Sequence, residues 1–364
     1  MLNINSAKCP KQWNFNGFWV DTVNCAKYLG VIFHASRGWI PHFAEKLGVA
    51  MFVTRELRRA GFIGGRNPPA KCLDTIRAMV WAVLDHGRAV ANLRGPRHEE
   101  IKAKLELFHF KILREVLGVS SRAAKLGVTG ETGDLPDIWR ERQRQMLVAR
   151  QMLRAPTGSL PRRMAEVAHK GDVKLGVFRL VADILKEQQS ERDISSFDSK
   201  KSIKNWVRMQ ATKEWLKGAK ASPRLGETYR DVVSLEMRGY LKFDFKGRQV
   251  LTKLRIDDLD LGAASFRGKA VPLPNCQLCG VEPETREHFL LKCRSLDEVR
   301  IKHKGTLEIT WGLSRNDAWR MLILAIPKGA SEDERRARDV GALAHDLWTR
   351  RVRTLGLSEN FFLR

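Results

Sequence analysis

Four residues toward the C-terminal end of the chain have the types and spacing of a metal site. They follow the pattern Cys-x2-Cys-x8-His-x4-Cys and are Cys276, Cys279, His288 and Cys293. Gly280 directly after the first pair predicts a turn that directs both sulfurs at one point, and His288 and Cys293 lie about one helical turn apart. Three thiolates and one imidazole complete a tetrahedral zinc shell with no position left open. We therefore expect a structural zinc ion here; the alternative is three idle or buried thiols and a surface histidine.

Acidic residues beside this cluster have two readings. Glu284 and Glu287 either orient His288 through hydrogen bonds or favour the start of a helix by their charge, and the helix start is the favoured interpretation. The remaining cysteines, Cys9, Cys25 and Cys72, are isolated, and we expect them to pack in the interior. Six cysteines in 364 residues do not make a disulfide scaffold. A reducing compartment inside the cell is expected, with the nucleus and the mitochondrial matrix both open.

Most of the elements that must hold the cluster are predicted to be helices. Residues 1–35 have short alternating runs around Asn16-Gly17, which indicate strands and a tight turn. Several later stretches carry apolar residues at helical spacing and basic residues on their other faces. These stretches are 41–60, 69–92, 96–117, 137–154 and much of 162–240. Short strands and turns are expected in 241–270, and two or three helices in 294–364. The expected fold class is mainly α with a short N-terminal β-hairpin.

The charge of the chain points to a polyanionic partner. There are 65 Lys plus Arg against 41 Asp plus Glu, a formal net charge of +24 spread along the sequence. A chain that is 43% hydrophobic with ten Trp can bury a core, so disorder is excluded. No apolar run approaches the roughly 18 residues of a membrane helix, so no membrane partner is expected. Nucleic acid is the favoured partner over a merely soluble basic surface.

The densest basic stretch is 200–255, with 15 Lys plus Arg against 5 acidic residues. The candidate nucleic-acid contacts in it are Lys200, Lys201, Lys204, Arg208, Lys213, Lys217, Lys220 and Arg224. A second candidate group is Arg140, Arg142 and Arg144. Each group reads equally well as a solvated helix face. Trp206 and Trp215 either stack on bases or form part of a core stripe, and the core is favoured.

The order of these features resembles the C-terminal half of a reverse transcriptase from a non-LTR, LINE-like retrotransposon. Lys27-Tyr28-Leu29-Gly30-Val31 resembles the primer-grip hairpin, with Tyr28, Leu29 and Gly30 at its tip, and Leu2 to Cys9 resembles the stretch after the catalytic box. The segments at Trp39–His42, Met79–Gly87, Leu105–Gly118 and Glu131–Arg144 are similar to successive thumb segments and the element beyond. Leu251–Arg255 before the cysteine cluster, and Glu284-Thr285 before His288, resemble the family's zinc-knuckle region.

The resemblance implies a domain order. Residues 1–35 would be a palm remnant, 36–155 a thumb-like helical domain and 156–250 a basic connector. The Pro, Gly and Ser residues of Ala155–Pro161 independently indicate a linker, and we place a domain boundary there. Residues 251–300 would be the zinc-knuckle region, and 301–364 C-terminal helices. Thumb and knuckle would lie beside RNA or an RNA/DNA hybrid.

The resembled polymerase needs an aromatic-x-Asp-Asp box, which would precede Leu2 and is not in this sequence. The single Asp-Asp pair, Asp257-Asp258, is expected at a turn or surface strand end. We therefore expect a non-catalytic RNA-binding protein within a ribonucleoprotein such as a ribosome. Two alternatives are the C-terminal piece of a split or truncated reverse transcriptase, and a structural subunit held by protein partners.

Overall fold

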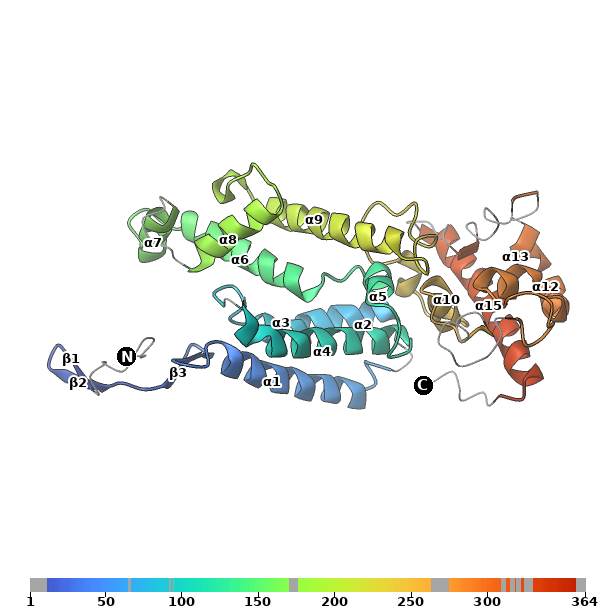
Figure 1. The fold of residues 1–364 in the computed structure, drawn as a ribbon, viewed down its shortest axis with the longest axis horizontal. Coiled ribbons are helices and arrows are strands. Elements are labelled where there is room, and N and C mark those ends of the chain that lie inside the picture. The colour runs from blue at the N-terminus through green and yellow to red at the C-terminus, as the bar shows by residue number, and fades with distance from the viewer. Residues whose placement is uncertain are drawn as a thin grey trace. The chain divides into compact units, whose positions relative to one another are not determined.

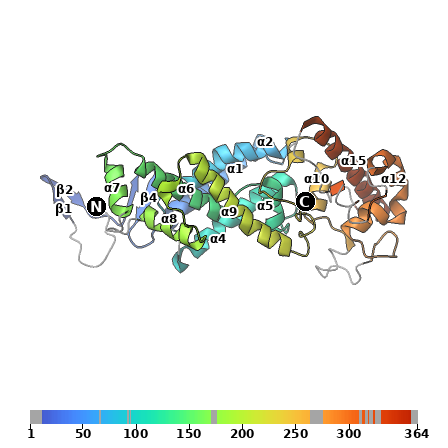
Figure 2. The same cartoon turned by 90° about the horizontal axis from the view of Figure 1, so that it is seen from above.

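The computed structural model describes the chain with several gaps. The described residues are 12–64, 67–91, 93, 95–169, 176–262, 275–308, 312–314, 318, 322–323 and 330–357. The chain forms two compact units that are interleaved along the sequence. The first contains residues 1–57, 75–109 and 135–210, and the second contains 58–74, 110–134 and 211–364. Figures 1 and 2 show a mainly helical fold with short strands at its N-terminal end, as predicted.

Two β-hairpins open the first unit. Strands β1 (Gln12–Phe15) and β2 (Phe18–Asp21) pair antiparallel, as do β3 (Cys25–Tyr28) and β4 (Val31–His34). Both hairpins turn through two residues with positive φ, Asn16-Gly17 and Leu29-Gly30. This is the geometry of a type I′ turn, whose twist matches that of paired strands. The predicted strands and Asn-Gly turn are therefore confirmed.

Helices follow the hairpins, and most begin where the sequence predicts. They are α1 (Ile40–Arg59), α2 (Pro69–Ile76), a π-helical turn (Arg77–Trp81), α3 (Ala82–Asp85), a 3-10 turn (Pro96–His98), α4 (Glu99–Leu117) and α5 (Lys125–Thr132). The helix predicted over 69–92 ends at Asp85, because the chain turns out of helical geometry at His86. Gly87, the next residue, has a φ of +80°, which lies in the region that favours glycine.

Three helices of the first unit pack together. They are α6 (Asp137–Leu153), α7 (Leu160–His169) and α8 (Gly176–Glu187), and α6 packs against both of the others (Figure 1). Trp139, Met146 and Ala149 give α6 a buried stripe. The turn at 155–161 joins α6 to α7 inside this unit. The structure therefore places a turn within one unit where the sequence suggested a linker between domains.

A buried ionic cluster ties α6 to the end of α3. The fully buried guanidinium of Arg88 lies 2.8 Å from Asp137 Oδ2 and 3.8 Å from Asp85 Oδ1. Arg140 lies 3.1 Å from the Asp137 carboxylate and 4.5 Å above the ring of Trp81. Because buried charges are costly unless paired, these partners fix the geometry of the first unit.

A single long helix, α9 (Lys200–Ala221), follows the 3-10 turn Ile194–Ser196. Its first half buries Ile203, Trp206 and Val207, whereas its second half buries Trp215 and Ala219. At 100° per residue these two stripes lie on different sides of the helix. The core reading of both tryptophans is confirmed, since Trp206 is 5% and Trp215 3% exposed.

The second unit is built around short helices and α15. Its elements include the 3-10 turn Gly239–Lys242, α10 (Arg248–Arg255), the π-helical turn His288–Lys292, the 3-10 turn Arg294–Leu296, α12 (Asp297–Lys302), α13 (Lys304–Glu308) and α15 (Ala330–Thr354). Helix α15 packs against α10, α12 and α13 (Figure 1). The prediction of strands over 241–270 is wrong for the described part, because Val250, Leu251 and Leu254 form a buried helical stripe.

The interior of the second unit holds a carboxylate. Glu131 is fully buried, and its oxygens accept hydrogen bonds from Tyr229 at 2.8 Å and Tyr240 at 2.7 Å. The Arg255 Nε lies 3.0 Å from both carboxylate oxygens. Burial alone would raise the pKa of Glu131, but the charges of Arg255 and Arg238 outweigh it, so this pKa is lowered. The network joins α5, α10 and the segment between α9 and α10.

Within the described residues, no helix combines the length and apolarity needed to cross a membrane.

Candidate metal centre

The predicted cysteine and histidine ligands lie together in the second unit. Their ligand atoms are all within 4.8 Å of one another. The Cys276 and Cys293 sulfurs are 3.6 Å apart, and the Cys279 sulfur is 3.4 Å from His288 Nε2. Cys276, His288 and Cys293 are buried, and Cys279 is half-buried. The sequence prediction of one four-residue cluster is confirmed.

These distances fit a tetrahedral zinc ion. Zinc binds thiolate at about 2.3 Å and imidazole at about 2.0–2.1 Å, so tetrahedral ligand atoms stand roughly 3.5–3.8 Å apart. Cys276 and Cys293, and Cys279 and His288, already have such separations. Three sulfurs and one nitrogen would leave no open coordination position. The donor set therefore fits a metal that stabilises structure and holds no reactive water.

The acidic partner of the histidine is one that the sequence analysis did not name. His288 Nδ1 lies 3.4 Å from Glu282 Oε2, and its other ring nitrogen faces the sulfurs. A carboxylate in this position holds the ring and strengthens the nitrogen ligand. Glu284 instead pairs with Arg351, and Glu287 lies 3.2 Å from Lys292 Nζ. Neither carboxylate is therefore the partner of His288 Nδ1. The favoured interpretation, that both are acids at the start of a helix, agrees with the helical turn that begins at Arg286.

Local backbone geometry produces the cluster. Gly280, with φ of +69°, donates its N–H to the Cys276 carbonyl at 2.8 Å, which closes the turn between the first two cysteines. The Cys276 N–H returns to the Glu282 carbonyl at 2.7 Å. The π-helical turn that begins at His288 then ends on Cys293, whose N–H donates to the His288 carbonyl at 2.8 Å. One π-turn thus carries the last two ligands, close to the single helical turn predicted.

The thiols of the cluster differ in the direction of their pKa shifts. Burial raises the pKa of Cys276 to about 12, and it also raises the pKa of Cys293. Burial acts in the same direction on Cys279, but hydrogen bonds from the backbone of Val281 and Glu282 outweigh it and lower its pKa. Amides that stabilise a thiolate prepare it for a cation.

Buried arginines attach the cluster to its unit. Arg300 on α12 donates to three carbonyls of the π-turn region: Leu290 at 2.9 Å, Cys293 at 2.7 Å and Phe289 at 3.1 Å. Arg351 on α15 forms a two-pronged pair with Glu284, at 2.7 and 2.8 Å. Side chains that satisfy carbonyls and carboxylates in the interior hold a loop-rich segment in one geometry.

A third arginine links the cluster to α10. The Arg286 guanidinium donates to the Leu254 carbonyl at 2.9 Å, the Arg255 carbonyl at 3.2 Å and the Arg224 carbonyl at 3.0 Å. The first two are among the last carbonyls of α10, which have no partner within the helix. Its Nε is also 3.4 Å from Asp257. These contacts attach the cluster to the C-terminal end of α10 within the second unit.

The predicted nucleic-acid contacts on α9 divide into two faces. Six lysines are exposed and make no hydrogen bond or ion pair with any residue that the structure describes; they are Lys200, Lys201, Lys204, Lys213, Lys217 and Lys220. Lys213 follows Lys204 by nine residues, or about two and a half turns, so the two groups lie on opposite sides of the helix. Arg208 is also exposed.

The other predicted arginines are engaged in the protein. Arg140 is buried in the ionic cluster of the first unit, so its assignment to nucleic acid is wrong. Arg142 pairs with Glu187 at 2.7 Å, and Arg144 lies 3.2 Å from Asp85. Arg224 pairs with Asp257 at 2.9 Å. The carboxylates that pair with Arg142, Arg144 and Arg224 lie at least 33 residues away along the chain, so the sequence did not indicate them.

The primer-grip-like residues lie at the tip of the second hairpin. Tyr28 and Leu29 are 68% and 78% exposed. The hairpin is held at the start of α1 by His42, whose Nε2 lies 2.9 Å from the His86 carbonyl and whose Nδ1 accepts from the Ile32 N–H at 3.3 Å. Burial lowers the pKa of His42, so the ring is neutral at pH 7. The stretch Leu2–Cys9 lies outside the described residues.

Two further sequence expectations can be compared with the structure. Asp257 lies at a turn after α10, as expected, but it is buried and not at a strand end. Asp258 accepts a hydrogen bond from the Ser120 N–H at 2.7 Å. Cys72 is buried, as expected, whereas Cys25 is exposed.

No protein-family model, no curated protein and no solved structure matches this chain. Its function is therefore inferred from its own residues.

Proposed function

We propose that this chain is a nucleic-acid-binding protein whose ligand is structured RNA. The observation that carries the proposal is the set of six exposed α9 lysines that lack a carboxylate partner among the described residues. A lysine without a counter-charge gains most from a phosphate, because binding releases the counterions condensed on the polyanion. The net charge of +24 supports the same partner, since it raises the rate and strength of association with any polyanion.

The zinc ion has a structural part in this function. Its ligands would be Cys276, Cys279, His288 and Cys293. It would hold the backbone of the segment that Arg286, Arg300 and Arg351 contact. The metal would lock loop-rich backbone, as it does in small zinc modules. It has no proposed role in RNA chemistry.

The origin of the chain is proposed from the resemblance of its motifs. We propose that it derives from a non-LTR retrotransposon reverse transcriptase, keeps thumb, connector and knuckle, and does not polymerise by itself. Its place would be in a ribonucleoprotein such as a ribosome. Asp257 and Asp258, the only Asp-Asp pair in the sequence, already bind Arg224 and Ser120. In the alternative of a split enzyme, adding an upstream half would restore primer extension.

The experiment is a salt titration of RNA binding by the whole chain. A structured RNA is titrated by fluorescence anisotropy at several salt concentrations, and the slope of log K against log salt is measured. Each lost phosphate contact lowers the slope by about 0.7–0.9. Replacing Lys200, Lys201 and Lys204 by Ala, or Lys213, Lys217 and Lys220, is therefore expected to lower it by about 2.

A control at two ion-paired lysines separates local contact from general charge. Lys102 and Lys104 on α4 pair with Glu99 at 2.7 Å and Glu100 at 2.6 Å. Replacing both by Ala is expected to leave the slope nearly unchanged. The proposal fails if the wild-type chain shows no RNA binding in low salt, or if the control variant weakens binding as much as either lysine triple.

A protein-binding subunit is the second candidate, and the first hairpin favours it. Phe18 and Trp19 on β2 are 76% and 68% exposed, and Val20 beside them is 41% exposed. Phe18 and Val20 lie on one face of the strand and Trp19 on the other. Adjoining exposed apolar side chains of this kind are typical of interaction surfaces. Crosslinking in the native particle would distinguish the candidates, because contacts to protein alone would favour this one.

A further inference from the structure

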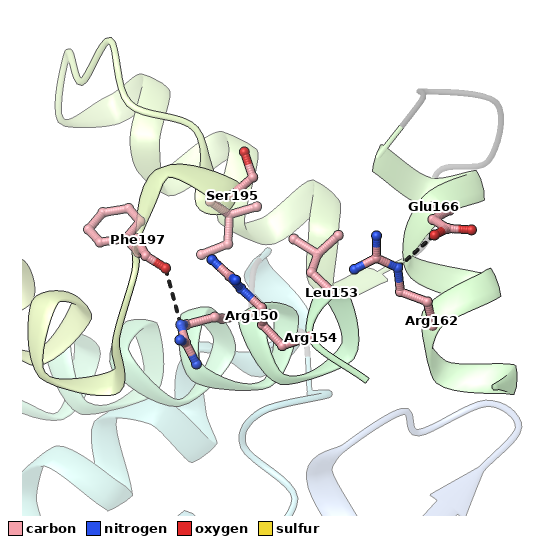
Figure 3. Close-up of a pocket in the computed structure, with 8 residues that line it drawn as sticks. Arg150, Leu153, Arg154, Arg162, Glu166, Ser195 and Phe197 are labelled. Atoms are coloured by element: carbon pink, nitrogen blue, oxygen red, sulfur yellow. Dashed lines mark hydrogen bonds and ion pairs between the residues drawn. The ribbon is translucent and has the colours of Figure 1, made fainter. Parts of the chain in front are cut away.

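A pocket in the first unit lies apart from every residue assigned above. It is about 350 Å³ in volume and lies between the C-terminal end of α6, the first turns of α7 and the 3-10 turn at Ile194 (Figure 3). Volumes from about 300 Å³ upward are typical of small-ligand sites. All of its lining residues belong to the first unit.

Three arginines give the pocket a positive lining. They are Arg150, Arg154 and Arg162, and the one acidic residue of the lining is Glu166. Arg162 Nε lies 2.6 Å from Glu166 Oε1, so one of the three charges is compensated. The lining therefore keeps an excess of two positive charges. Like charges gathered at one cavity repel each other, and an anion between them would relieve this repulsion.

The other two guanidiniums have no carboxylate partner in the part of the chain that the structure describes. Arg150 donates from Nε to the Phe197 carbonyl at 3.1 Å and from Nη2 to the Asp198 carbonyl, which orients the group but does not neutralise it (Figure 3). The exposed Arg154 side chain makes no hydrogen bond or ion pair with any residue that the structure describes. The Asp198 carboxylate forms no ion pair with either group; it accepts hydrogen bonds from Ser202 and Ser199, which lower its pKa.

The floor of the pocket is apolar. Leu153 and Ile194 supply it, and each is at least nine-tenths buried, so the floor is held by the core of the unit. The Phe197 carbonyl is turned toward Arg150, and its ring packs edge-on against Trp206 (Figure 3). Such a surface favours an organic group over a bare ion. Guanidinium planes also stack on flat rings, and their forked donors match the oxygens of a phosphate.

We propose that this pocket binds a nucleotide, with Arg154 and Arg150 on its terminal phosphate and its base against the apolar floor. The phosphate monoester is either that of a free nucleotide or the 5′-phosphate of a nucleic-acid strand. The inference goes beyond RNA binding by α9 and does not depend on it, because the pocket residues are separate from the α9 lysines.

The test uses the full chain and adenosine 5′-monophosphate as the probe, followed by isothermal titration calorimetry. Arg154→Ala is the diagnostic variant, since the side chain is exposed and its removal leaves the fold intact. Arg163→Ala is the matched control, because it removes the same charge one residue beyond Arg162 and outside the lining. Arg154→Ala is expected to weaken binding about tenfold or more, and Arg163→Ala to leave it unchanged.

Further ligands identify the source of the phosphate. Adenosine lacks the anion and inorganic phosphate lacks the base, so each is expected to bind at least about tenfold more weakly than the monophosphate. Competition by a 5′-phosphorylated oligonucleotide, but not by its 5′-hydroxyl form, would identify a strand end; competition by neither would identify a free nucleotide. The proposal is overturned if the monophosphate does not bind at millimolar concentration, or if both arginine variants weaken it equally.

Discussion

The arginines of the two units differ in what they contact. Around the cysteine cluster, Arg300 and Arg351 are buried and bind backbone carbonyls or a carboxylate at 2.7–3.1 Å. Around the pocket of the first unit, Arg154 is exposed and lacks a partner in the described chain, and Arg150 binds only carbonyls. Each of these arginines adds one positive charge to the net charge of the chain. The difference lies in their contacts: arginines bound to buried groups stabilise the fold, whereas arginines without a carboxylate partner in the described chain are available to a ligand.

The largest expected effect tests the structural half of this comparison. Cys293→Ser removes a buried metal ligand, and zinc contributes about 10–16 kcal/mol to the folding of small zinc peptides. We expect loss of helicity and of cooperative unfolding in the second unit, followed by circular dichroism, and the same result from a strong zinc chelator. Cys25→Ser is the control, because this thiol is exposed and outside the cluster. Equal behaviour of the two variants would contradict a structural metal.

The next largest effect concerns the pair that links the cluster to α15. Arg351→Met leaves Glu284 buried without its partner, which is expected to cost about 3–5 kcal/mol of unfolding free energy. Arg350→Met breaks an exposed pair with Glu298 and is expected to cost about 1 kcal/mol or less. Denaturant unfolding measures both. If the neighbouring variants cost the same, Arg351 does not hold the cluster.

A third prediction uses pH on the buried pair of Glu131 and Arg255. Because the folded-state pKa of Glu131 is lowered, its stabilisation is complete above the ordinary carboxyl pKa of about 4.3 and is lost as the pH falls through the folded-state value. Glu131→Gln is expected to cost about 1–3 kcal/mol near pH 7 and to flatten the loss of stability in acid. Glu100→Gln, at an exposed site, is the control. An unchanged acid transition in Glu131→Gln would refute this role.

The smallest effect belongs to the pocket. Arg154→Ala is expected to change the unfolding free energy by no more than about 0.5 kcal/mol, because it removes no buried contact. Arg300→Ala would leave three π-turn carbonyls without their donor and is expected to cost several times more. Thermal unfolding of the two variants compares them directly. A large loss in Arg154→Ala would mean that this arginine serves the fold.

The features that could be predicted from the sequence are those that depend on residues close together along the chain. The metal ligands were found because their spacing is local, and most helices because their apolar residues recur at helical period. Partners far apart along the chain were missed. Arg300 and Arg351 carry no motif, and Asp85 lies beside Arg140 although the two are distant in sequence. Residues 241–245 alternate like a strand but begin with a 3-10 turn that buries Tyr240 and Leu241.

The most direct measurement is the metal content and coordination of the purified native chain. Elemental analysis with X-ray absorption at the zinc edge should give one zinc per chain bound by three sulfurs and one nitrogen, from Cys276, Cys279, Cys293 and His288. The Cys293→Ser chain should lose this signal. A native chain that folds fully with no bound metal, or one whose zinc is bound mainly by oxygen, would contradict the structural metal centre.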